Sequence, residues 1–220
     1  MIYAAFITEN ILSEFNMAYT PCAQSIAQNI VQNCDAPLVG GYTGRAVLIP
    51  AGSAYSVTQD AENPRMLVSI TPAQSTAVVI DNLAVVAPFN GSSTAASADN
   101  GIRQYTKTIA FRIPSRGAGV SKNIVEPLSN GEGYLAVVEK KDNNGADGKY
   151  EVIGFQQALK VNEDGIQRTE DENGGAILAT MSCVEGWFEA TLVGAKEGTP
   201  GAYTLAGAKA AFASLVAAAI

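Results

Sequence analysis

The 220-residue sequence predicts a mainly β fold, an antiparallel β-sandwich or barrel with one short internal helix and a C-terminal helix. Several segments alternate apolar and polar residues, as strands with one buried face do. Turn-forming runs of Gly, Asn, Asp, Ser and Pro separate these segments. With 47% hydrophobic and 16% charged residues, the chain has enough apolar side chains to bury a substantial core.

The strongest strand pattern lies in residues 131–193. We expect strands at 134–139, 149–161 and 176–193, joined by turn-rich links at 140–148 and 162–175. Tyr150 and Val152 should point to one side of their strand, and Glu151 and Ile153 to the other. In the last strand, the residues on one face are Leu178, Thr180, Ser182 and Val184. The pattern predicts an antiparallel meander with one buried face, in which residues 162–165 form a turn.

Shorter strands are expected upstream, at residues 45–49, 65–70, 76–80, 83–87 and 104–113. The strands at 65–70 and 76–80 should pair around the turn that Thr71 begins. Within 104–113, Tyr105, Lys107, Ile109, Phe111 and Ile113 oppose Thr106, Thr108, Ala110 and Arg112. Residues 90–101 are low in hydrophobicity and rich in turn formers, which predicts a mobile loop.

Two helices are expected. Ser121 can cap a short helix whose length Pro127 limits and whose apolar side chains are Ile124, Val125 and Leu128. Residues 205–220 are Ala-rich and form an amphipathic helix, with Phe212, Leu215 and Val216 on one face.

We divide the chain into an N-terminal arm or extension, residues 1–33, and a β-sandwich domain, residues 34–220. Residues 1–12 are apolar without a clear period, so they form either a strand or an arm that docks on a neighbour. Met17 offers an alternative start, which would make the first sixteen residues an extension. The N-terminus lacks the basic region of a secretory signal, and no apolar run approaches the ~20 residues of a membrane-spanning helix.

The net charge of −7 is unevenly distributed. Residues 1–131 hold seven Lys/Arg against eight Asp/Glu, whereas residues 132–220 hold seven against thirteen. An acidic surface repels phosphate, which argues against tight binding of nucleic acid, although ordinary solubility explains the charge equally well. The three cysteines have no CxxC spacing; Cys183 is expected in the core, and Cys22 and Cys34 are either reduced or paired.

The chain contains no histidine, which excludes Ser-His-Asp and Cys-His catalysis and histidine metal sites. The carboxylates at 163–164 and 170–172 lie in polar links where solvated charge is expected. Residues 142–148 are only faintly similar to a calcium loop, because Ile153 stands where the glutamate ligand is needed, and a hairpin turn is favoured. We therefore predict no catalytic residue, cofactor or metal, and a protein that is not an enzyme.

Assembly is the function for which candidate residues can be named. Arg103, Lys107, Arg112, Arg116 and Lys122 form a modest basic cluster, interpreted as charge partners of the acidic second half, across a subunit contact or on the surface. Trp187 and Phe188 are adjacent on a predicted strand, so one should enter the core and the other should face an interface or a lumen. The candidate self-assembly residues are Asn90, Ser93, Asp99, Arg103, Arg112, Trp187 and Phe188.

The order of features along residues 34–220 supports a resemblance. Cys34-Asp-Ala-Pro37 and Gly40-Gly41 precede a strand ending Leu48-Ile49, and Ile109-Ala-Phe-Arg-Ile113 precedes the short helix. Gly133 to Glu139, Lys149 to Gly154 and Leu159 to Val161 follow, then a Gly-rich turn and the last strand. This order resembles the tail tube proteins of tailed phages that infect gut Bacteroidetes.

The resemblance implies a virion subunit, assembled in the host cytoplasm, that forms stacked hexameric rings. Strands of neighbouring subunits would close an inner β-barrel through which DNA passes, and other tail proteins would be partners. The loop at 90–101 would become ordered only when rings stack. The alternatives are a head-decoration or head–tail connector protein, a β-sandwich module that binds glycans, or an enzyme with an unusual carboxylate or Tyr/Lys site.

Overall fold

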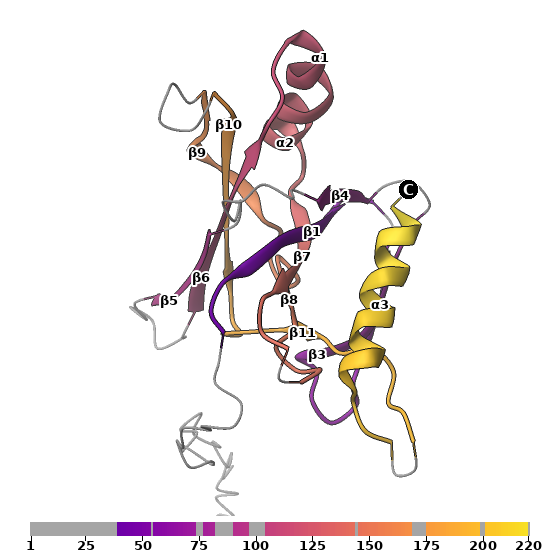
Figure 1. Ribbon diagram of the computed structural model, residues 1–220. Coiled ribbons are helices and arrows are strands. Elements are labelled where there is room, and N and C mark those ends of the chain that lie inside the picture. The colour runs from indigo at the N-terminus through magenta and orange to yellow at the C-terminus, as the bar shows by residue number, and fades with distance from the viewer. Residues whose placement is uncertain are drawn as a thin grey trace, which may run out of the picture. The chain divides into compact units, whose positions relative to one another are not determined.

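The described strands form two separate sheets rather than a closed barrel (Figure 1). The computed structural model describes residues 39–53, 55–73, 77–81, 90–96, 104–143, 145–168, 175–198 and 201–219, of which 90–96 are described by their backbone. The predicted N-terminal arm, the Cys22–Cys34 alternatives, the strand at 83–87 and the carboxylates at 170–172 lie outside these residues.

The larger sheet, sheet A, contains seven strands in a mixed arrangement. Their order is β2 (Tyr55–Gln59), β3 (Met66–Pro72), β11 (Thr191–Leu192), β8 (Tyr150–Ile153), β7 (Tyr134–Lys140), β1 (Tyr42–Pro50) and β4 (Val78–Asp81). The β3–β11 pair is parallel and the other pairs are antiparallel. The smaller sheet, sheet B, is antiparallel, in the order β5 (Asn90–Ala96), β6 (Gln104–Ile113), β10 (Ile177–Glu185) and β9 (Lys160–Arg168).

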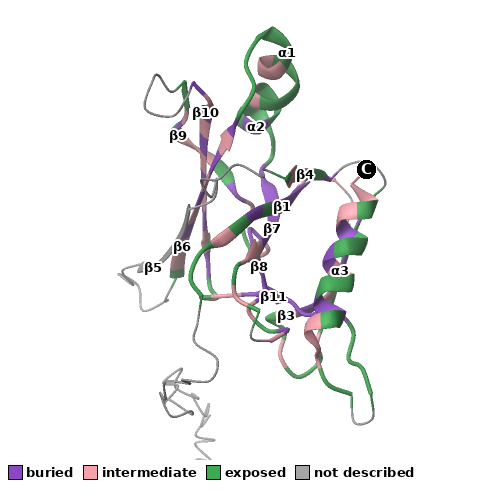
Figure 2. Ribbon diagram, in the orientation of Figure 1, coloured by how far each residue is buried: buried purple, intermediate pink, exposed green. Residues whose placement is uncertain are grey.

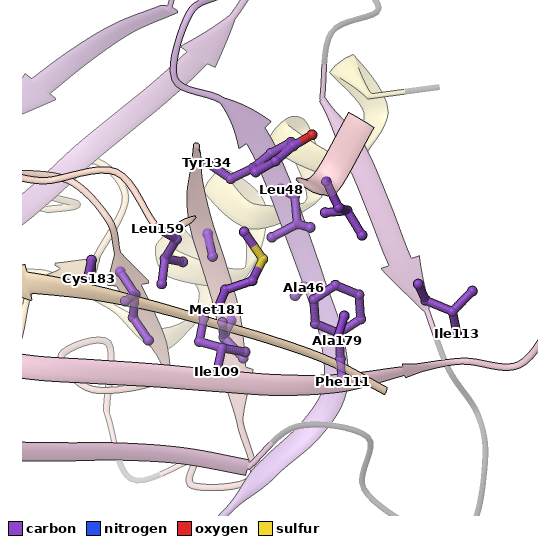
Figure 3. Packing of buried hydrophobic residues seen from close by; sticks show 14 of the residues in the cluster. Ala46, Leu48, Ile109, Phe111, Ile113, Tyr134, Leu159, Ala179, Met181 and Cys183 are labelled. Carbon is purple, nitrogen blue, oxygen red and sulfur yellow. The ribbon is translucent and has the colours of Figure 1, made fainter. Parts of the chain in front are cut away.

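A first apolar core lies between the two sheets (Figure 3). Alternate residues of β6 and β10 point inward from sheet B, because successive side chains of a strand lie on opposite faces. They meet alternate residues of β1 and β7 from sheet A. The buried members include Ala46, Leu48, Ile109, Phe111, Tyr134, Ala136, Ala179, Met181 and Cys183. The predicted alternation of β6 and β10 is therefore confirmed, as is the place of Cys183 in the core.

A second core lies on the opposite face of sheet A, under helix α3 (Leu205–Ala218). The predicted terminal helix is thus confirmed, and Phe212 and Leu215 are buried as expected. Thr204 caps it, because its hydroxyl accepts a hydrogen bond of 2.9 Å from the amide of Gly207. The Phe212 ring stacks on Tyr150 of β8 with 4.5 Å between ring centroids. Figure 2 shows the buried residues of α3 on the side that faces the strands.

The internal helix is present, but its start differs from the prediction. It comprises α1 (Ala118–Val120), a π-helical turn η1 (Ser121–Val125) and α2 (Glu126–Asn130). Ser121 lies inside the helix and does not cap it; Gly117, with a φ of 112°, precedes the first helical residue. Leu128 is the buried residue of α2, whereas Ile124 is 40% exposed. No helix in the described ranges is long and apolar enough to cross a membrane.

The predicted strand connections need three corrections. β3 and β4 do not pair with each other, because β4 pairs with β1 at the other edge of sheet A. The meander is divided between the sheets: β7 and β8 lie in sheet A, and β9 and β10 in sheet B. The last strand ends at Glu185, and after a bend at 186–188 the chain returns to sheet A as β11.

Two of the predicted loops are strands. Residues 162–165 do not turn the chain but lie within β9, where a register shift against β10 accommodates them. Residues 90–96 are not a loop either: they form β5, which pairs with β6 over its full length without a partner subunit. The composition of this segment gave the wrong prediction, because Asn, Gly and Ser are poor strand formers. Pairing with β6 nevertheless keeps the backbone of these residues extended.

Helix α3 should contribute strongly to stability. We expect Phe212→Ala to lower the free energy of unfolding by about 3–5 kcal/mol, because it leaves a cavity against Tyr150. The exposed Ser214 on the same helix is the matched control, and Ser214→Ala should change stability by less than about 0.5 kcal/mol. Denaturation by urea measures both; equal losses in the two variants would contradict the docking of α3 described here.

Candidate functional site

The two edges of sheet B differ in character. The edge strand β9 carries Lys160, Glu163, Asp164 and Arg168 and has an irregular register with its neighbour. Charges and bulges of this kind protect an edge from pairing with another chain. The opposite edge strand, β5, has the sequence Asn-Gly-Ser-Ser-Thr-Ala-Ala with no charged residue and pairs with β6 in an unbroken register. β5 therefore lacks both of the protections that β9 has.

Four aromatic residues form two pairs near the bend where β10 leaves sheet B. Tyr105 and Phe188 form an edge-to-face pair with ring centroids 5.5 Å apart, and Phe155 stacks on Trp187 at 6.0 Å. Trp187 is half-buried and packs against the second core, whereas Phe188 is 51% exposed. Trp187 therefore borders the core that one of the two rings was predicted to enter, and Phe188 is the exposed ring. Both residues, however, lie in the bend after β10 and not on a strand.

A buried ionic cluster joins the two sheets near this bend. Lys107 of β6 is 1% exposed, and its Nζ lies 2.9 Å from Oε2 of Glu185 at the end of β10. Its distance to Oε1 of Glu151, on β8 of sheet A, is 4.0 Å. Nζ nevertheless makes no hydrogen bond of ordinary geometry. The prediction that Lys107 lies on the surface or in a subunit contact is therefore wrong, because its side chain is buried within the subunit. Its carboxylate partners do come from the acidic second half of the sequence, as predicted.

Glu151 is held by two further groups. Its Oε2 accepts a hydrogen bond of 2.9 Å from the hydroxyl of Tyr42 and lies 3.2 Å from Nζ of Lys140, which also pairs with Glu189. Burial and the carboxylate of Glu151 raise the pKa of Tyr42 well above its usual value. Burial alone would lower the pKa of Lys140, but the carboxylates of Glu151 and Glu189 outweigh it, and the pKa is raised. Glu151 is thus fixed through one oxygen, and its other oxygen faces Lys107.

Glu185 is fixed in the same way by backbone. Its Oε1 accepts hydrogen bonds from the amides of Gly154 (3.1 Å) and Gln156 (3.2 Å). These amides belong to a bulge between Ile153, which pairs with Ala136, and Leu159, which pairs with Tyr134. Gly154 has a φ of 89°, and a side chain there would collide with the backbone of Tyr134. The bulge therefore depends on glycine at this position.

The candidate self-assembly residues are only partly brought together. Asn90 and Ser93 lie on β5, and Asp99 and Arg103 lie outside the described residues. Arg112 is half-buried on the face of β6 that points away from the core. Sequence analysis missed Tyr42, Lys140, Glu151 and Glu185. The available signal was Lys107 itself, which alternates with Tyr105 and Ile109 on the inward face and so required buried carboxylate partners.

Metal ligation and known proteins give no further assignment. Within the described part of the chain, no group of three or more Cys, Asp or Glu side chains is arranged to hold a metal ion. Comparison with protein-family models, with curated proteins and with solved structures found no match.

The buried pair should be sensitive to loss of one member. We expect Lys107→Met to destabilise the fold by about 3–5 kcal/mol, because it leaves the Glu185 carboxylate buried without its cation. The second change in Lys107→Met/Glu185→Gln should recover part of this loss, since the amide keeps the oxygen that Gly154 and Gln156 bind and removes the charge. Lys122→Met, at an exposed lysine, is the control for unfolding in urea. A double variant less stable than Lys107→Met would refute this explanation.

Alkaline pH should destabilise the domain. Burial raises the pKa of Cys183 from 9.0 to about 12 and that of Tyr150 from 10.0 to about 12. The folded state therefore holds these protons more tightly than the unfolded state, and this stabilisation is complete below pH 9 and is lost as the pH rises towards about 12. Cys183→Ala should show a smaller decrease in the free energy of unfolding between pH 9 and 10 and a slope unchanged from wild type below pH 8. Identical slopes above pH 9 would contradict the assignment.

Proposed function

We propose that this chain is a structural subunit of a phage virion that assembles with copies of itself into stacked hexameric rings forming a tail tube. The single observation that supports this most is the contrast between the edges of sheet B. An uncharged, regular edge such as β5 invites strand pairing with another chain, and a ring closes every such edge. In this proposal, β5 pairs with a strand of the neighbouring subunit.

The outer face of sheet B would then line the channel. On β6 and β10, this face carries Thr106, Thr108, Ala110, Arg112, Leu178, Thr180, Ser182 and Val184, with Arg112 the one charged side chain among them. Such a face offers few cations to DNA phosphates, and the net charge of −7 adds a general repulsion. DNA would therefore move through the tube without being held. A chain with this role needs no catalytic residue.

The exposed aromatic ring would be a second contact. Phe188 is one of the large apolar side chains that the described chain exposes, and its neighbour Tyr105 holds it from one side. Rigid aromatic side chains of this kind supply much of the binding energy at protein interfaces. We therefore assign Phe188 to the contact between subunits.

Electron microscopy of the purified full chain tests the proposal directly. We expect rings or tubes in negative stain, together with a sedimentation coefficient that rises with protein concentration. A chain that remains monomeric at high concentration and binds glycans on an array would instead identify a binding module. Rings that do not stack would favour the head–tail connector alternative.

The contribution of the β5 edge is tested by adding charge to it. Ser92→Lys/Thr94→Lys should abolish ring formation, because two lysines on the edge strand oppose pairing with another chain. Gln167→Lys, on the edge strand β9 that is already charged, is the matched control and should assemble normally. Loss of assembly in both variants, or in neither, would remove β5 from the interface.

The contribution of Phe188 is tested by truncation. Phe188→Ala should raise the concentration needed for assembly by at least about tenfold, or ~1.4 kcal/mol per contact. Stability in urea should change by less than about 0.5 kcal/mol, because half of the ring is already exposed. Normal assembly of this variant in sedimentation experiments would show that Phe188 lies outside the contact.

A further inference from the structure

We propose that Lys107 and Glu185 form an intramolecular isopeptide bond that covalently joins β6 to β10. The modification would occur in the isolated subunit, whether or not subunits assemble. Three features of the ionic cluster lead to it: the close approach of amine and carboxyl, the exclusion of water, and a second carboxylate beside the amine.

The amine of Lys107 and the carboxyl group of Glu185 are held close enough to react. Nζ of Lys107 lies 2.9 Å from Oε2 of Glu185, and both side chains are at most 2% exposed. Nζ makes no hydrogen bond of ordinary geometry. A buried ammonium without hydrogen bonds is costly, whereas an amide nitrogen at the same place carries no charge and has one proton to donate. The surroundings therefore suit the cross-linked product better than the ion pair.

The carboxyl group of Glu185 is held for attack. Its Oε1 accepts hydrogen bonds from the backbone amides of Gly154 and Gln156, at 3.1 and 3.2 Å. Two backbone N–H groups directed at one oxygen stabilise the negative charge that develops there when an amine adds to the carbon. In the product, the same two groups would donate to the carbonyl oxygen of the amide.

The reaction balances without any added reagent. The ammonium of Lys107 transfers one proton towards Glu185, and the resulting amine attacks Cδ of the protonated carboxyl group. The bond from Nζ to Cδ forms, the bond from Cδ to Oε2 breaks, and Oε2 leaves as water with two of the three ammonium protons. Glu151, whose Oε1 is 4.0 Å from Nζ, is placed to accept a proton from the nitrogen and to return it to the leaving oxygen.

Condensation of an amine with a carboxylate is unfavourable between free groups in water. Here both groups belong to paired strands, since Lys107 lies opposite Cys183 and Glu185 opposite Tyr105 on the same inward face. Fixed placement of this kind corresponds to effective molarities of about 10⁵–10⁸ M, which is the advantage that the site offers. The water that is formed leaves a buried site, at whose edge the side chains of Lys140 and Glu189 are 23% and 33% exposed.

The intact mass of the full chain tests the proposal. We expect the wild-type protein to weigh less than its sequence by the mass of one water molecule, and tandem mass spectrometry to find the peptide of Lys107 joined to that of Glu185. On denaturing, reducing gels the wild type should migrate faster than Lys107→Met. A wild-type mass equal to that of the sequence, in both fresh and aged protein, would overturn the proposal without reference to any variant.

Variants identify the atoms involved. Lys107→Met should have its full sequence mass; loss of water from this variant would place the reaction elsewhere and refute the cross-link. Lys122→Met, the exposed control, should lose water as the wild type does. Glu151→Gln should slow the loss of water in freshly made protein by at least tenfold. An unchanged rate in this variant would exclude the proton transfer assigned to Glu151.

Discussion

Burial of the central strands of sheet A on both faces is the constraint on which the rest of the domain depends. Sheet B covers one face and α3 the other, so neighbouring residues such as Leu135 and Ala136 of β7 enter different cores. A sheet that is covered in this way cannot offer a face for binding. Among the described strands, the surfaces left for contact with other molecules are the strand edges and the outer face of sheet B.

The ionic cluster is the polar counterpart of this packing. The cluster connects β6 and β10, the two central strands of sheet B, to β8 of sheet A through Lys107, Glu185 and Glu151. It lies at the end of β10, where the chain passes from sheet B to sheet A. During folding, before the proposed bond forms, a buried charge that has only one arrangement of partners penalises any shifted register, since a slip of one residue would turn Lys107 towards the outer face. The apolar core gives most of the stability, and the cluster makes one alignment of the sheets preferable to its neighbours.

Local sequence patterns predicted the individual helices and strands better than they predicted which strands pair. The alternation in residues 104–113 and the spacing of Phe212 and Leu215 reflect burial along a single element, and both predictions are confirmed. Strand pairing depends on contacts between residues distant in sequence, which local patterns do not contain. The pairing of β4 with β1 and the end of β10 at Glu185 were therefore not predicted. Of the cluster, Lys107 was noticed but its carboxylate partners were not, because they lie on other strands and, for Glu151, in the other sheet.

The position of α3 along the chain has a consequence for biosynthesis. Leu67 and Ile70 of β3 belong to the core under a helix that begins at Leu205, so the ribosome releases the strand long before the helix that packs on it. During that interval, one side of sheet A is an open apolar surface that chaperones can recognise and that other nascent chains can adhere to. The rate at which residues 205–218 emerge thus sets how long each newly made molecule stays vulnerable to aggregation.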